Sequence, residues 1–273
     1  MKFKVGLIQL ESALGEKEQN LKLAIELITQ AAAEGANIVC LPELFLTGYN
    51  LNVLGGRLRE LADTVDGGAV KTLCDTAKQL GVYIVAPLIL QREGAELLDN
   101  AAVLIDDGGR VQGAYCKNHT FGGENGEGRF FAAHGEYPVF ETKYGTIGIL
   151  ICYDANFPEP ARILALKGAQ VLFMPAAWRV QEQDIWHLVT AARANENTVY
   201  LAAVNAWQES GDLFLFGESK LLDPRGHTVG QIDAPGSSVL VEEVDIDKLH
   251  EMRGSMPWLC DRHPEGYAEI SKI

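Results

Sequence analysis

The sequence lacks the features of a membrane-spanning, disulfide-bonded or nucleotide-binding protein. No apolar run among its 273 residues reaches the roughly 20 residues that a membrane-spanning helix needs. Its five cysteines are odd in number and include no CxxC pair, which argues against a disulfide framework and against a thiolate zinc site. It contains no Walker loop, and no GxGxxG motif follows a strand pattern.

Positive charge is scarce, because the chain carries 23 Lys and Arg residues against 37 Asp and Glu residues. The formal net charge of −14 repels phosphate backbones, so we expect no nucleic-acid partner. The first residues enter a strand pattern at once, without the separate apolar core and small-residue cleavage site of a signal peptide. Together with the unpaired thiols, this predicts a cytoplasmic protein without a membrane partner.

Strand and helix patterns alternate along the chain, with no linker, repeat or low-complexity segment between them. Most of the strand patterns are continuous apolar runs, which are typical of strands buried on both faces. The sequence therefore predicts a single layered α/β domain over residues 1–273. The expected strands are 3–10, 37–43, 82–90, 100–105, 109–117, 138–141, 146–152, 170–175, 199–205, 218–224 and 237–246. The expected helices are 17–34, 69–80, 158–167 and 184–196, with a short helix after the last strand.

The segment after Arg253 has little periodicity but contains Trp258 and Tyr267. Burial of large aromatic side chains stabilises a protein. We therefore expect this C-terminal tail, about 254–273, to pack on the domain or on a second subunit.

Cys152 is the first candidate for chemistry. It ends the apolar run 145–152, and the polar segment that follows leads into a helix pattern at Pro158. A thiol at a strand-to-helix turn is held by rigid elements yet open on one side, and a nearby helix N-terminus favours the thiolate. Taken alone, however, a cysteine is more often a small core residue.

Two further strand patterns end in charged residues, Glu43 and Lys117. Because the carboxyl ends of strands gather at one edge of a layered α/β fold, we expect these residues to meet Cys152 there. A carboxylate can take the proton of a thiol as the sulfur attacks. An ammonium offsets the repulsion between carboxylate and thiolate, and it can stabilise an oxyanion.

The segments that carry these residues are LPELFLTGY (41–49), YCKNHT (115–120) and ICYDANFPE (151–159). In this order they resemble the three signatures of the nitrilase superfamily of carbon–nitrogen hydrolases, and the similarity to its amidase-like branch covers most of the chain. The resemblance implies a four-layer α-β-β-α sandwich, and it implies a homodimer or a larger even-numbered homo-oligomer. It also implies that Glu43 is the general base, Lys117 the catalytic lysine and Cys152 the nucleophile.

Three more residues are expected to bind substrate or the oxyanion. The resemblance implies that Glu124 helps to position substrate and that the backbone N–H of Tyr153 is a second oxyanion donor. Trp178, in the segment MPAAW (174–178), is a candidate pocket residue, although aromatic residues after strands are as often core. We expect Asp154 to hold the turn through backbone hydrogen bonds. Asn156 and Cys116 stand where many relatives carry arginine. Because Asn156 lies close to Cys152 in the sequence, its departure argues against inferring the substrate from arginine-bearing relatives.

The expected reaction is the hydrolysis of a small carboxamide to an acid and ammonia through a thioester on Cys152, without metal or organic cofactor. Hydrolysis of N-carbamoyl amines and supply of ammonia as a glutaminase are alternatives. A nitrilase proper is less favoured, because nitrilases tend to carry tryptophan and glutamate where Tyr153 and Asp154 stand. A non-catalytic scaffold is disfavoured by the complete set of three residues, and acyl transfer to an amine stays chemically open.

Overall fold

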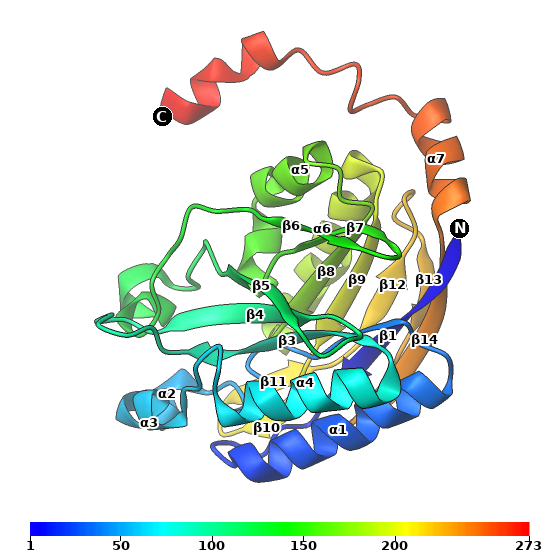
Figure 1. Ribbon diagram of the computed structural model, residues 1–273. Coiled ribbons are helices and arrows are strands. Elements are labelled where there is room, and N and C mark those ends of the chain that lie inside the picture. The colour runs from blue at the N-terminus through cyan, green and yellow to red at the C-terminus, as the bar shows by residue number, and fades with distance from the viewer. Residues whose placement is uncertain (273) are drawn as a thin grey trace.

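The computed structural model describes residues 1–272, and of Glu124 it describes the backbone alone. Two six-stranded sheets lie face to face, and helices cover the outer face of each sheet (Figure 1). The layers therefore follow the order α-β-β-α, which confirms the predicted fold class.

The first sheet has the strand order β14-β1-β2-β3-β4-β5. Strands β1, β2 and β3 run parallel to one another. Strand β14 pairs antiparallel with β1, β4 with β3, and β5 with β4. The outer face carries α1 and α4, and α4 ends at Gly81, which adopts the left-handed conformation with φ 67°. The bounds are β1 (Lys2–Gln9), β2 (Ile38–Cys40), β3 (Tyr83–Leu90), β4 (Asp99–Ile105), β5 (Val111–Cys116), β14 (Ser238–Asp245), α1 (Lys17–Ala33) and α4 (Gly68–Leu80).

The second sheet has the strand order β13-β12-β9-β8-β7-β6, with β7, β8 and β9 parallel and the outer strands antiparallel. Helices α5 and α6 cover its outer face. A separate hairpin, β10-β11, completes the strands. The bounds are β6 (Val139–Thr142), β7 (Gly145–Ile149), β8 (Val171–Ala176), β9 (Tyr200–Asn205), β10 (Trp207–Ser210), β11 (Leu213–Phe216), β12 (Lys220–Leu222), β13 (Thr228–Gln231), α5 (Pro158–Leu166) and α6 (Gln183–Asn197).

Alternate residues of the central strands enter two different cores. In β1, Leu7 packs between the sheets with residues such as Ile149 and Phe173, while its neighbour Ile8 packs under α1. Because both faces of these strands are covered, both sets of side chains are apolar. This packing explains why the strands read as continuous apolar runs.

Several strands end earlier than the apolar runs that predicted them. The ladder of β2 ends at Cys40, that of β5 at Cys116 and that of β7 at Ile149. The backbone then turns sharply, and Leu44 and Cys152 adopt positive φ angles of 51° and 48°. The three charged or nucleophilic candidates thus lie in the turns that follow the strands.

Five short strands and α-helices have no counterpart among the expected ones: β13, the two strands of the hairpin β10-β11, and two helices of four residues each, α2 (Leu51–Leu54) and α3 (Leu58–Leu61). A four-residue segment spans hardly more than one helical turn, so it displays no repeating apolar period. Tertiary contacts decide such segments, as shown by the burial of Leu54 and Leu58 in one apolar cluster.

The C-terminal part consists of α7 (Ile246–Ser255) and an irregular tail that ends in the 3₁₀-helix η6 (Pro264–Lys272). The tail arches away from the body of the molecule (Figure 1), and Trp258 and Tyr267 are exposed on it. Packing of this tail on the domain or on a second subunit stays a prediction. No helix within residues 1–272 combines the length and apolar character that crossing a bilayer requires.

Gly148 of β7 offers a test of the packing between the second sheet and α5. A Cβ atom there would lie 2.8 Å from Leu172 Cδ2 and 3.1 Å from Leu164 Cβ. We expect Gly148→Ala to lower the free energy of unfolding by about 1–3 kcal/mol through overpacking, measured by urea denaturation. The control is Gly135→Ala, whose Cβ would meet nothing within 4 Å. Equal midpoints for the two variants would contradict this account of the interface.

Candidate active site

Glu43 lies in the turn after β2 and is 1% exposed. Its Oε1 accepts hydrogen bonds from Asn100 Nδ2 and Lys117 Nζ, both at 2.7 Å. Its Oε2 accepts a hydrogen bond from the backbone N–H of Ala177, just after β8, at 2.9 Å. Groups from both sheets therefore fix this carboxylate in one orientation.

Lys117, also 1% exposed, lies between two carboxylates. Besides Glu43, its Nζ lies 2.9 Å from Oε1 and 2.9 Å from Oε2 of Glu127. Glu127 is itself held by the hydroxyl of Tyr49 at 2.8 Å and by the backbone N–H of Phe121 at 2.7 Å. One ammonium and two carboxylates thus form a buried, fully hydrogen-bonded cluster.

The charges of this cluster control one another. Burial alone would lower the pKa of the Lys117 ammonium, but the carboxylates of Glu127 and Glu43 more than offset it, so that its pKa lies well above the usual range. Burial raises the pKa of Glu43, and the attraction of Lys117 opposes that rise only in part. Lys117 is therefore a permanent cation at neutral pH, and Glu43 is a carboxylate with a raised affinity for a proton.

Cys152 begins the short 3₁₀-helix η4 (Cys152–Asn156), in a backbone conformation that costs a residue with a Cβ about 1–2 kcal/mol. Asp154 stabilises the turn, as the sequence predicts. Its Oδ2 accepts hydrogen bonds from the backbone N–H of Ile151 at 2.9 Å and from the hydroxyl of Tyr115 at 2.6 Å. Its Oδ1 accepts one from the backbone N–H of His119 at 3.0 Å.

The α-helix α5 begins at Pro158, where the sequence predicts it, with η4 between it and Cys152. Burial and the charge of Glu43 outweigh the effect that its N-terminus would have on the Cys152 thiol. Burial raises the pKa of the Cys152 thiol well above its usual range, the charge of Glu43 raises it further, and the opposing effect of Lys117 is smaller. The resting group at neutral pH is therefore a thiol, which needs a base before it can attack.

A cavity of about 510 Å³ opens over Cys152. Its lining combines apolar and aromatic surface with a few polar groups, as is typical of sites for small molecules. Among the lining residues are Tyr49, Glu127, Cys152, Tyr153, Trp178 and Arg179.

The predicted substrate-binding residues fall into two groups. Tyr153 and Trp178 line the cavity together with Cys152. Trp178 is 5% exposed, and its indole N–H donates to the backbone oxygen of Glu182 at 2.9 Å, so it also belongs to the core. The side chain of Glu124 lies outside the part of the chain that the structure describes.

Sequence reasoning missed two residues of the buried cluster, Glu127 and Asn100. Glu127 lies in a glycine-rich loop with no apolar period, and two 3₁₀-turns, η2 (Gly123–Asn125) and η3 (Glu127–Arg129), bring it back toward Lys117. Asn100 belongs to a strand that otherwise reads as ordinary core. The sequence feature that could have indicated Asn100 is its position as a polar residue at the start of an apolar run.

Comparison with known proteins gives a consistent result. The family model described as carbon-nitrogen hydrolase matches residues 4–254. A 2-oxoglutaramate amidase from Bacillus subtilis is 32% identical over 98% of this chain and 100% of its own length. An omega-amidase from Danio rerio is 31% identical over 98% of this chain and 97% of its own.

Solved structures show the same likeness. Nit3 from Saccharomyces cerevisiae, a member of branch 10 of the nitrilase superfamily, has a TM-score of 0.85 at 26% identity and covers 94% of both chains. A mutant amidase from Nesterenkonia sp. AN1 has a TM-score of 0.84 at 27% identity, over 98% of this chain and 96% of its own. That structure carries the acetamide moiety of fluoroacetamide added covalently to the active-site cysteine.

The hydrogen bonds of Asp154 generate a test of the turn that presents Cys152. Asp154→Ala leaves the buried donors of Ile151 and Tyr115 without a partner, and we expect it to lower the free energy of unfolding by about 3 kcal/mol. Denaturant unfolding measures this change. The matched control is Asp261→Ala, at an exposed position of the tail. If the Asp154→Ala protein were as stable as this control, the assignment of Asp154 as the residue that holds the turn would be contradicted.

Proposed function

The chain belongs to the carbon–nitrogen hydrolase family, and from that membership we propose that it hydrolyses a small carboxamide to a carboxylic acid and ammonia. The observation that carries this proposal is the buried cluster of Glu43, Lys117 and Glu127 beside the thiol of Cys152. The cluster supplies a base and a cation, and Cys152, the nucleophile, lines a cavity of about 510 Å³ together with Glu127.

In the first step the sulfur of Cys152 attacks the amide carbonyl carbon while Glu43 takes the thiol proton. The new carbon–sulfur bond converts the carbonyl oxygen into an oxyanion. Lys117 and the backbone N–H of Tyr153 stabilise that oxyanion, and loss of one such donor typically costs about 10²–10³ in rate. The raised pKa of Glu43 suits this role, because a stronger base takes the proton of a weakly acidic thiol more readily.

In the second step the carbon–nitrogen bond breaks. Glu43 returns its proton to the leaving nitrogen, ammonia departs, and the acyl group stays on Cys152 as a thioester. Glu43 then takes a proton from water, whose oxygen attacks the thioester carbon. The acid leaves, and the proton returns to the Cys152 sulfur, so that the enzyme is regenerated.

Glu127 has a distinct positioning role in this proposal. When Glu43 carries the proton, its attraction for Lys117 falls, and a lysine with a single partner would lose its anchor. Both oxygens of Glu127 lie 2.9 Å from Lys117 Nζ, so the ammonium stays charged and in place during each proton transfer.

The class of amide is the finer part of the proposal. The cavity is of a size for small molecules, and two cationic side chains, Arg129 and Arg179, are among its lining residues. A carboxylate at the far end of the substrate would complement that positive charge. Two relatives carry the names 2-oxoglutaramate amidase and omega-amidase, which supports a test of amides that also bear a carboxylate.

A cytoplasmic location and an even-numbered homo-oligomer stay predictions. The five free cysteines support the first, because unpaired thiols suit a reducing compartment. The exposed side chains of Trp258, Tyr267 and Ile270 on the tail support the second.

An acyl adduct on Cys152 tests the chemistry directly. We expect a panel of small amides, with and without a carboxylate, to release ammonia without carbon dioxide, and mass spectrometry of the quenched enzyme to find the acyl mass on Cys152. Cys152→Ala should lose turnover by at least about 10³-fold. The exposed Cys260→Ala should retain it. Turnover by Cys152→Ala would refute the mechanism, and carbon dioxide release from carbamoyl amines would favour an N-carbamoyl hydrolase.

The raised pKa of Glu43 makes a prediction for the pH profile. The base must be ionised, so kcat/KM is lost as the pH falls through the pKa of Glu43. We expect the acid limb of kcat/KM to lie above the value of about 4.3 for an ordinary glutamate. Steady-state rates in a buffer of constant ionic strength measure the position of this limb. The pH range is roughly 4 to 8, in which carboxylates and histidines titrate. A limb at or below the ordinary value would contradict the assignment of Glu43 as the base.

A further inference from the structure

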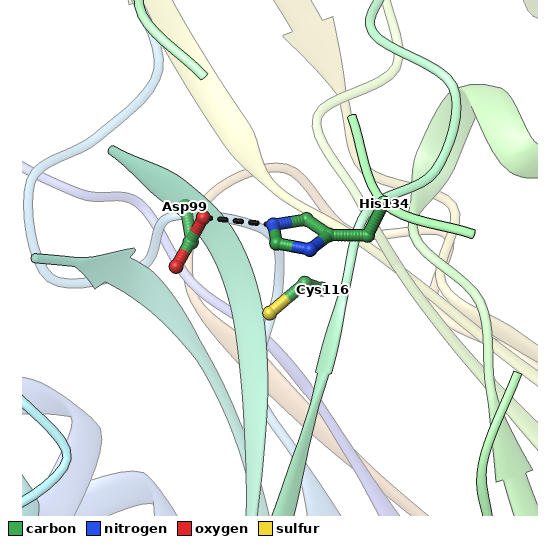
Figure 2. Close-up of side chains that lie close together, drawn as sticks. All are labelled: Asp99, Cys116 and His134. Carbon is green, nitrogen blue, oxygen red and sulfur yellow. Dashed lines mark hydrogen bonds and ion pairs between the residues drawn. The ribbon is translucent and has the colours of Figure 1, made fainter. Parts of the chain in front are cut away.

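Asp99, Cys116 and His134 form a second cluster of chemically active side chains (Figure 2). None of them belongs to the catalytic cluster. Each offers one oxygen, sulfur or nitrogen atom, and these three atoms all lie within 4.8 Å of one another. Asp99 is 1% exposed, whereas the other two are partly buried. The proposed mechanism uses none of them.

The register of β4 and β5 places this cluster behind the catalytic site. Cys116 pairs with Ala101 across the two strands, so Asp99, two residues from Ala101, lies on the same face as Cys116. That face packs toward the outer helical layer, as Ala101 and Cys116 do. Asn100 and Lys117 are the next residues along each strand and point to the opposite face, where both contact Glu43.

Backbone hydrogen bonds hold the segment that carries His134 beside β4. The N–H of Leu98 donates to Phe130 O at 2.9 Å, and the N–H of Ala132 donates to Leu98 O at 2.9 Å. The Nε2 atom of His134 then reaches Asp99 Oδ1 at 2.8 Å. The three side chains are therefore brought together by the strands and by a tethered loop rather than by chance contact of flexible chains.

We propose that Asp99, Cys116 and His134 bind a divalent transition-metal ion of the zinc type. Carboxylate oxygen, thiolate sulfur and imidazole nitrogen are the ligands that Zn²⁺ takes in proteins. Ligand atoms around tetrahedral Zn²⁺ lie roughly 3.3–3.8 Å apart, given metal–ligand bonds of about 2.0–2.3 Å. Side-chain shifts of about one ångström therefore close the site, and a water molecule completes the tetrahedron.

Arg92 supports the carboxylate of this site from outside. Its Nε donates to Asp99 Oδ2 at 2.5 Å and its Nη2 donates to Oδ1 at 3.1 Å. The Arg92 side chain is 55% exposed, so it can move away from Oδ1 while it keeps Oδ2. Such an outer partner orients a metal-binding carboxylate and leaves its other oxygen to the ion.

Binding must release a proton. Cysteine binds a metal ion as the thiolate and not as the thiol. The incoming dication forms a metal–sulfur bond, and the thiol proton passes to the buffer. The proton that His134 Nε2 donates to Asp99 Oδ1 moves to Nδ1, the other ring nitrogen, so that Nε2 can bind the ion and no second proton is released. The carboxylate and the new thiolate together balance the two charges of the ion.

The site lay outside what the sequence could indicate, because its ligands come from β4, from β5 and from a loop beyond the glycine-rich segment. The ion takes no part in the proposed hydrolysis. It would instead fasten the ends of β4 and β5, whose next residues, Asn100 and Lys117, hold Glu43.

Cobalt titration of the Cys152→Ala protein tests the site without interference from the catalytic thiol. Co²⁺ is the probe, because sulfur-to-cobalt charge-transfer absorption reports thiolate ligation directly. We expect saturable binding of one ion per chain at micromolar Co²⁺, with that absorption and with one proton released per ion. Zn²⁺ added afterwards should displace Co²⁺ and abolish the absorption.

Variants in the same background assign the ligands. Cys116→Ser should abolish the charge-transfer absorption, and His134→Ala should weaken binding by at least about tenfold. Cys260→Ser, which alters an exposed thiol next to Asp261 in the tail, is the matched control and should change neither. Circular dichroism checks that each variant is folded, and His134→Ala decides the test if Cys116→Ser is not.

Three outcomes would overturn the proposal: no saturable binding by the Cys152→Ala protein, absorption that survives in Cys116→Ser, or absorption that disappears in Cys260→Ser. In each case Asp99, Arg92 and His134 form an ion-pair network without a metal. None of these outcomes bears on amide hydrolysis, because the hydrolysis assays use the protein with Cys152 intact.

Discussion

One buried ammonium between two carboxylates, Lys117 between Glu43 and Glu127, is the interaction on which the active site depends. Burying charges is costly unless every partner is in place. Here Asn100, Tyr49 and backbone N–H groups complete the hydrogen bonds of both carboxylates. Burial, and after it the charge of Glu43, raises the pKa of the nearby Cys152 thiol, and burial also raises the pKa of Glu43, the proposed base.

The active site is complete only when the two sheets are packed together. Glu43 and Lys117 follow strands of the first sheet, whereas Ala177 and Cys152 follow strands of the second. The apolar core between the sheets thus fixes the distances on which the chemistry depends. Within residues 1–272, two of the four non-glycine residues with positive φ angles, Leu44 and Cys152, lie next to or within the proposed catalytic set. Asp154 holds the second of these strained turns.

The strands β4 and β5 serve two faces of one sheet. Successive residues of a strand point to opposite sides, so Asn100 and Lys117 face Glu43 while Asp99 and Cys116 face outward. A change at the outer cluster therefore acts on the backbone that positions the inner one. The sheet itself lies between the proposed metal site and the proposed catalytic residues.

Local pattern determined much of this protein. Apolar runs gave the order of the main strands and helices, and three short motifs indicated Glu43, Lys117 and Cys152, because periodicity and motif spacing are properties of neighbouring residues. Only the tertiary structure decided the rest. Glu127 reaches Lys117 through the turns of an irregular loop, and Asp99, Cys116 and His134 meet from three separate segments. The raised pKa of the Cys152 thiol likewise follows from burial and from charges that lie far away along the chain, which no local sequence pattern shows.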